Sequence, residues 1–225
     1  MTVAEVLKPS AVPAAPAGTA RRIRAGIWLT WLHLRTRRVP AAILALAVCG
    51  AVLRAALTWH WTFATGPYAQ QVPLIIEAGA AAVIAVTAHS PFGEAERATG
   101  RWLPYLRLFA AVALTGLAIL ALHLGAVGES LNEGILVLAR NVIGCTGIGL
   151  LCSLVTGGLL AWTLPIGYMV FCQYALLEAW TAPWTWPVCP PDDRGAWIGA
   201  CAVFAAGLVL FTVIGPRTRL SDDSC

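Results

Sequence analysis

The stretch GAWIGACAVFAAGLVLFTVI, residues 195 to 214, runs for twenty residues without a charged side chain. At ~1.5 Å per residue, a helix of that length covers the ~30 Å hydrocarbon core of a bilayer. In the whole chain of 225 residues, 59% are hydrophobic and 12% are charged, whereas soluble domains carry about 25% charged residues. The sequence therefore predicts a membrane protein and excludes an ordinary water-soluble fold.

Five more apolar runs precede this one, separated by short connections. We therefore expect an all-α membrane protein whose six transmembrane helices form one domain, residues 39 to 215. An Ala- and Pro-rich disordered tail at 1 to 20 and a short cytoplasmic tail at 216 to 225 flank it. The predicted spans are residues 41 to 61, 72 to 89, 106 to 127, 134 to 155, 159 to 180 and 195 to 214.

The basic residues fall almost entirely on one side of the predicted bundle. Twelve of the fifteen lie before the first span, between the second and third spans, or after the last span. The connection between the fifth and sixth spans holds only Arg194, next to Asp192 and Asp193. Because cytoplasmic flanks keep positive charge during insertion, this distribution predicts that both chain ends are cytoplasmic.

The segment RRIRAGIWLTWLHLRTRR, residues 21 to 38, is too short and too basic to span the membrane. Ile27, Trp28, Trp31 and Leu34 recur at helical spacing between its two arginine clusters. We expect an amphipathic elbow helix on the inner leaflet, because the arginines suit anionic headgroups and the apolar face suits acyl chains. A further contact with a partner protein stays open.

Two connections carry more sequence than a turn requires. HSPFGEAERATGRWLPYLR, residues 89 to 107, mixes charged and aromatic residues and predicts an amphipathic cytoplasmic helix, with a solvated loop as the alternative. WTAPWTWPVCPPDDRG, residues 180 to 195, contains four prolines that break a helix, and Trp180, Trp184 and Trp186, which we expect at the outer interface. This second connection is either a small re-entrant or interfacial cap, or a plain interfacial loop.

Polar residues inside the spans are the most direct pointers to function, because a charge at membrane depth costs several kcal/mol unless it is paired or hydrated. Nearly all of them fall in the outer half of the bilayer, where Arg54 and Glu77 lie at similar depths and could pair. The set is either an ionic network that fixes helix packing and seals the outer side, or the polar lining of a substrate path or outer gate. This intramembrane polar network comprises Arg54, Glu77, His123, Arg140, Asn141 and Glu178.

Small residues recur inside the spans. Gly144, Gly147 and Gly149 in the fourth span predict a close approach of neighbouring helices. Most of the seven cysteines also lie in apolar segments, and we expect them to be small packing residues rather than disulfide partners.

The sequence lacks the motifs of the common catalytic and metal sites. No segment fits the P-loop GxxxxGK[ST], so this chain does not hydrolyse ATP by that route. The four histidines are dispersed, and the cysteines form no CxxC pair. We therefore expect a protein without enzymatic activity, metal site or cofactor of its own.

The order of these elements resembles the type-two ABC exporter permeases, the membrane subunits of bacterial exporters whose ATPase is a separate chain. Permeases of this family have an elbow helix before span one, a coupling helix between spans two and three, and re-entrant elements between spans five and six. The stretch EAERATGRWLPYLR looks like the coupling segment of that family. The resemblance implies coupling to the ATPase through Glu94, Glu96, Arg97, Gly100, Arg101, Leu103 and Pro104.

The resemblance also implies partners and a location. These are a separate ABC ATPase subunit that carries ATP and Mg, a second permease subunit in a homodimer or heterodimer, and membrane lipids, but no nucleic acid. The implied location is the bacterial plasma membrane, and arginine at fourteen of the fifteen basic positions suggests a GC-rich genome such as that of an actinobacterium. The alternative class is a non-transporting membrane anchor, immunity or regulatory protein that acts through interactions.

Overall fold

The structure is a computed structural model. All of its described residues belong to one compact unit, residues 37 to 225. Every regular element in the described part is a helix, so the predicted all-α class is confirmed. The predicted elbow helix, residues 21 to 38, and both predicted tails lie outside the described residues. The described residues are 39–59, 71–87, 103–128, 134–178, 180 and 182–214.

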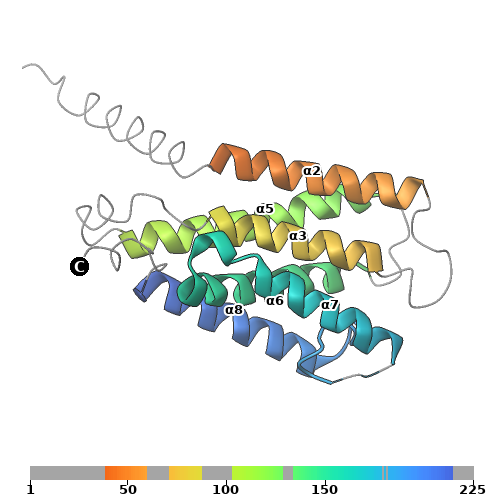
Figure 1. Ribbon diagram of the computed structural model, residues 1–225. Helices are drawn as coiled ribbons and strands as arrows, with labels where there is room; N and C mark the ends of the chain where they lie inside the picture. The colour runs from red at the N-terminus through yellow and green to blue at the C-terminus, as the bar shows by residue number, and fades with distance from the viewer. Residues whose placement is uncertain are drawn as a thin grey trace, which may run out of the picture. The chain divides into compact units, whose positions relative to one another are not determined.

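The helices follow the predicted spans with shifts of a few residues at their ends. The fifth span differs most, because a short 3-10 turn and an α-helix share it. The elements, shown in Figure 1, are α2 Val39–Thr58, α3 Gln71–Thr87, α5 Leu103–Ala126, α6 Gly134–Thr156, η3 Gly158–Leu160, α7 Thr163–Leu177 and α8 Arg194–Ile214.

Five helical segments of the described chain are long and apolar enough to cross a membrane, and η3 and α7 together make one of them. The apolar helix α3 has 17 residues and is shorter. At ~1.5 Å per residue it measures about 25 Å, against a hydrocarbon core of ~30 Å. The structure thus supports five spans by length and composition, and α3 stays the predicted sixth.

Prolines and a glycine mark several helix ends. Pro40, Pro73, Pro104 and Pro165 lie in the first turns of α2, α3, α5 and α7. A proline is tolerated there because the N–H groups of a first turn have no partner within the helix. Gly157 separates α6 from η3 with φ of 80°, a left-handed conformation that favours glycine.

Four helix ends lie together on one face of the bundle. Val39 at the start of α2, Thr87 at the end of α3, Arg107 near the start of α5 and Phe211 near the end of α8 line one small recess. The helices therefore run alternately up and down, as the predicted path requires (Figure 1, left). Following the orientation predicted from the arginines, we call this the inner face and the opposite one the outer face.

Helix α6 is the central helix of the bundle. In its most apolar stretch of 18 residues, 67% is buried, whereas the corresponding stretches of the other four spans are 17 to 33% buried. A Cβ atom added to Gly147 would lie 2.6 Å from the backbone of Phe204 in α8. One added to Gly149 would lie 2.7 Å from Cβ of Ala85 in α3. The close helix approach predicted here is confirmed at Gly147 and Gly149, whereas Gly144 faces the indole ring of Trp186.

The outward faces of the described helices are apolar. Val213, Phe109 and Val155 are 76%, 73% and 70% exposed, and many other large apolar side chains are exposed too. A monomeric soluble protein rarely exposes large contiguous apolar surface, whereas lipid-facing helices do so by default. The packing therefore agrees with the length of the helices and with a membrane protein.

Candidate functional site

Three polar side chains of the predicted network lie buried in the outer half of the bundle. Glu77 is 3% exposed, and Arg140 and Asn141 are fully buried. Glu77 lies six residues into α3, and Arg140 lies six residues into α6. At ~1.5 Å per residue both backbones sit about 9 Å below the outer helix ends. We call these three residues the polar cluster.

Asn141 binds the carboxylate of Glu77. Its Nδ2 donates a hydrogen bond of 2.8 Å to Oε2 of Glu77, which joins α6 to α3. A buried carboxylate is costly in an apolar environment unless donors compensate for its lost hydration. The bond therefore matters more here than it would at a wet surface, and it holds α3 and α6 in one register.

Arg140 binds the connection between α7 and α8. Its Nη2 donates to the carbonyl oxygen of Cys189 at 2.7 Å, and its Nη1 donates to the carbonyl oxygen of Pro190 at 2.8 Å. A guanidinium presents its donors in a rigid planar fork, so two neighbouring carbonyl groups suit it well. Arg140 thus fastens the connection to the central helix.

The connection itself, residues 182–193, folds into successive turns that we call the outer cap. Backbone N–H groups of Thr185 and Val188 donate to the carbonyl oxygens of Ala182 and Thr185, at 2.8 and 2.9 Å. The hydroxyl of Thr185 is fully buried and accepts from the backbone N–H of Ala182. Of the two predicted alternatives, these bonds favour the cap over a plain loop.

Cys189 is a buried thiol of the outer cap. Its Sγ donates to the carbonyl oxygen of Ala182 at 3.3 Å. Burial, together with the nearby carboxylate of Asp193, raises the pKa of the Cys189 thiol above its ordinary value. The group therefore stays protonated at neutral pH and acts as a hydrogen-bond donor rather than a reactive thiolate.

Trp186 anchors the outer cap inside the bundle. We expected it at the membrane interface with Trp180 and Trp184, but it is 4% exposed while those two are 46% and 60% exposed. Its indole ring packs directly on Gly144 of α6, where an added Cβ would lie 2.6 Å from the ring. The interfacial placement of Trp186 was therefore wrong, because a glycine in the facing helix leaves room for an indole.

Tyr168 of α7 braces the same tryptophan. The ring centroids of Tyr168 and Trp186 are 4.8 Å apart with planes inclined by 37°. The Tyr168 hydroxyl donates to the carbonyl oxygen of Trp184 at 2.7 Å. The cap is therefore held from α6 by Arg140 and from α7 by Tyr168.

The other three predicted network residues lie apart from the polar cluster. Arg54 is exposed on α2 and donates from Nη1 to the carbonyl oxygen of Val127 at 3.0 Å. His123 is exposed on α5, and Glu178 is exposed at the end of α7. Arg54 and Glu77 thus each bind a different described group, so the ion pair considered between them is not the contact that the structure gives.

Some buried polar atoms of this region have no hydrogen-bond partner among the described residues. They are Oδ1 of Asn141, Oγ1 of Thr146 and Nε1 of Trp186. Atoms of this kind are commonly satisfied by buried water. The neighbourhood of the polar cluster therefore has hydrogen-bonding capacity beyond the contacts made among the described residues.

Two of the seven predicted coupling residues lie in the described part of the chain. Glu94, Glu96, Arg97, Gly100 and Arg101 lie outside the described residues. Leu103 and Pro104 begin α5, directly after that segment.

The sequence interpretation missed the carbonyl groups of Cys189 and Pro190 as partners of Arg140. The richness of residues 180 to 195 in Trp and Pro was nevertheless a signal that this connection folds.

The Asn141–Glu77 bond predicts that substitutions at these two residues have non-additive effects on the free energy of unfolding. We expect Asn141→Leu to lower the free energy of unfolding by about 2 kcal/mol, because it strips a donor from a buried carboxylate. Adding Glu77→Leu should then cost less than it does alone, with a coupling energy of about 0.5–3 kcal/mol. Unfolding of the purified protein in mixed micelles measures both values.

A matched cycle uses Ser153→Ala in place of Asn141→Leu. The buried Ser153 hydroxyl donates to the carbonyl oxygen of Leu150 in its own helix, twelve residues along α6 from Asn141. At ~18 Å along the helix, its effect should add to that of Glu77→Leu. Additive effects of Asn141→Leu and Glu77→Leu would contradict the contact.

No protein-family model, no curated protein and no solved structure matches this chain. Its function must therefore be inferred from its own residues and their contacts.

Proposed function

We propose that the chain is the membrane-spanning permease subunit of an ABC exporter, which couples ATP hydrolysis by a separate ATPase subunit to substrate translocation. The observation that carries the proposal is the shared inner recess of α3 and α5. Thr87 ends α3 and Arg107 lies near the start of α5, and both line that recess. The two described helix ends that flank the charged run therefore lie together at one place on the inner face, where the proposed docking lever would be anchored.

The polar cluster supplies a route from that lever to the outer side. Helix α3 leads directly into the segment and binds α6 through Glu77 and Asn141. Helix α6 in turn binds the outer cap through Arg140. A shift of α3 imposed at the inner face would pass through these bonds to the cap. We assign the cap the role of an outer gate that Arg140 holds closed.

The proposal includes the partners. ATP and Mg bind to the ATPase subunit, and a second permease subunit, identical or different, completes the translocation path. The protein lies in the bacterial plasma membrane with both chain ends cytoplasmic, because the arginine-rich segments then face the side that retains positive charge. The ATPase docks on residues 89 to 107.

The coupling segment gives the test. The combined reversal Glu94→Arg, Glu96→Arg and Arg97→Glu should lower the amount of ATPase that copurifies with the tagged chain from native membranes at least about tenfold, because like charges brought together at an interface are costly. ATP-dependent export should fall with it. Quantitative mass spectrometry of the purified complex measures the first effect.

The matched control reverses Asp222 and Asp223 to lysine, in the tail predicted on the same side of the membrane. This variant should copurify ATPase at the level of the unaltered chain. If the unaltered chain never brings down an ATPase with a P-loop, the permease proposal is wrong. A non-transporting anchor or regulatory protein would then be the better description, and its partner would be sought in the same preparation.

A further inference from the structure

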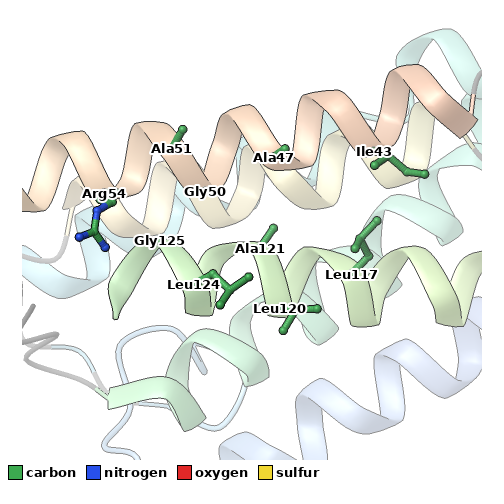
Figure 2. Close-up of a pocket in the computed structure, with 10 residues that line it drawn as sticks. All are labelled: Ile43, Ala47, Gly50, Ala51, Arg54, Leu117, Leu120, Ala121, Leu124 and Gly125. Atoms are coloured by element: carbon green, nitrogen blue, oxygen red, sulfur yellow. The ribbon is translucent and has the colours of Figure 1, made fainter. Parts of the chain in front are cut away.

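A groove runs along the surface of the bundle between α2 and α5. Its volume is about 390 Å³, within the range of ~300–1,000 Å³ that is usual for small-molecule sites. Ile43, Leu120 and Leu124 are among the apolar side chains that line it (Figure 2). The groove is open to the surroundings of the bundle along its side. It is separate from the polar cluster, whose residues lie in α3 and α6.

Glycines hollow this groove. A Cβ atom added to Gly50 in α2 would lie 2.5 Å from the carbonyl oxygen of Ala121 in α5, and one added to Gly125 would meet the carbonyl oxygen of Gly50. The two backbones are therefore in contact, and the small residues between the larger ones leave the surface above the contact concave.

The groove follows the middle part of α2. Its lining extends along α2 from Ile43 to Arg54, which at ~1.5 Å per residue is about 16 Å. This is about half the thickness of the ~30 Å hydrocarbon core, and the groove crosses the middle of the helix, because Ile43 and Arg54 each lie four residues from an end of α2. Arg54 precedes Thr58, the end of α2, by four residues and so lies about 6 Å from the outer helix end, within reach of the headgroup region.

Among the described residues that line the groove, Arg54 is the single charged side chain. Figure 2 shows it at one end, beside Gly125 and Leu124, while Ile43 and Leu117 lie toward the other end. Its exposed guanidinium has five N–H donors, and the bond from Nη1 to Val127 uses one of its nitrogen atoms. Phosphate oxygens are favourable acceptors for such a group.

We propose that this groove binds an anionic phospholipid of the outer leaflet, with one acyl chain along the groove and the phosphate at Arg54. An apolar groove about 16 Å long with a cation at its outer end complements an acyl chain and its phosphate in both shape and charge. A second copy of the chain fits less well, because a symmetric contact would bring another Arg54, not an anion, to this place. The site is independent of the proposed ATPase partner.

Native mass spectrometry of the detergent-solubilised full chain tests the site. Phosphatidylglycerol should bind about tenfold more tightly than phosphatidylcholine with the same acyl chains, because only the former carries a net negative charge for Arg54. Arg54→Gln should bring the two lipids to within about twofold, and Arg54→Lys should keep most of the preference. The control is Arg194→Gln, an exposed arginine at the same end of the bundle that does not line the groove.

Filling the groove tests the acyl chain. Ala47→Trp places a large side chain in the lining and should weaken the binding of both lipids, whereas Ala205→Trp, at an exposed position of α8, should weaken the binding of neither.

Equal affinities for the two lipids, or an Arg54→Gln chain that binds phosphatidylglycerol as the unaltered chain does, would overturn the proposal. So would an Ala47→Trp chain that changes from dimer to monomer with unchanged lipid binding, since the occupant would then be a second copy. If Arg54→Gln does not fold, Arg54→Lys and Ala47→Trp decide.

Discussion

Arg140→Met should lower the free energy of unfolding by about 3 kcal/mol, one of the two largest effects that we expect of any single substitution in this chain. The guanidinium donates to the carbonyl groups of both Cys189 and Pro190, and methionine removes both bonds. The Pro190 carbonyl then keeps only the backbone N–H of Asp193 as a donor. The outer cap should then detach. Unfolding in mixed micelles gives the free energy, and maleimide labelling of Cys189, 4% exposed in the intact cap, reports the detachment.

Two further variants define this effect. Arg194→Met removes an exposed arginine from the same end of the bundle and should change stability by less than about 0.5 kcal/mol, without faster labelling of Cys189. Arg140→Lys should have intermediate stability and an intermediate rate of Cys189 labelling, because an ammonium group cannot imitate the planar fork of a guanidinium. Labelling of Cys189 that is equally slow in the Arg140→Met chain would show that Arg140 does not hold the cap, and the gate that we assign to it would have to be abandoned.

Gly147→Ala should also destabilise the bundle, by about 2–3 kcal/mol. The added methyl group would lie 2.6 Å from both Cα and N of Phe204, so α6 and α8 would have to move apart. Backbone atoms cannot turn aside as a flexible side chain can. The effect should appear in the same unfolding measurement.

Gly79→Ala is the matched comparison for this variant. Gly79 is also a helical glycine, in α3, and a Cβ atom added there would have no described atom within 4 Å. Alanine is favoured over glycine in a helix by up to about 1 kcal/mol, so this change should be neutral or stabilising. Opposite signs for the two substitutions would identify the α6–α8 contact as their cause, whereas equal effects would rule out the close approach at Gly147.

The two contacts differ in kind. Gly147 brings α6 and α8 together by apolar packing over their backbones, while Asn141 and Arg140 connect α6 to α3 and to the cap by hydrogen bonds. Packed backbones resist small displacements, and a hydrogen-bonded contact can exchange partners. In the proposed permease, α6 and α8 would therefore move together, whereas the hydrogen bonds between Arg140 and the cap could be exchanged when the gate opens.

The amino-acid sequence was sufficient to predict the all-α class, the approximate bounds of the helices and the positions of the buried polar residues along them. Helix length in a membrane depends on a run of apolar residues, which is local information, and the depth of Glu77 or Arg140 follows from counting along a helix. Prolines near the helix starts and glycines in α6 add signals of the same local kind. The predicted placement of Trp186 failed because its environment is not local.

Tertiary structure decided which groups meet. The rotation of each helix about its axis and the order in which helices pack turn Glu77 toward Asn141 and leave Arg54 exposed at the end of a groove. The same packing sets Gly144 opposite Trp186 and brings two cap carbonyl groups to Arg140. An apolar run is similar on all sides, so its sequence carries little information about which side faces a neighbour. The partners of its few polar residues therefore emerge only when the helices are packed.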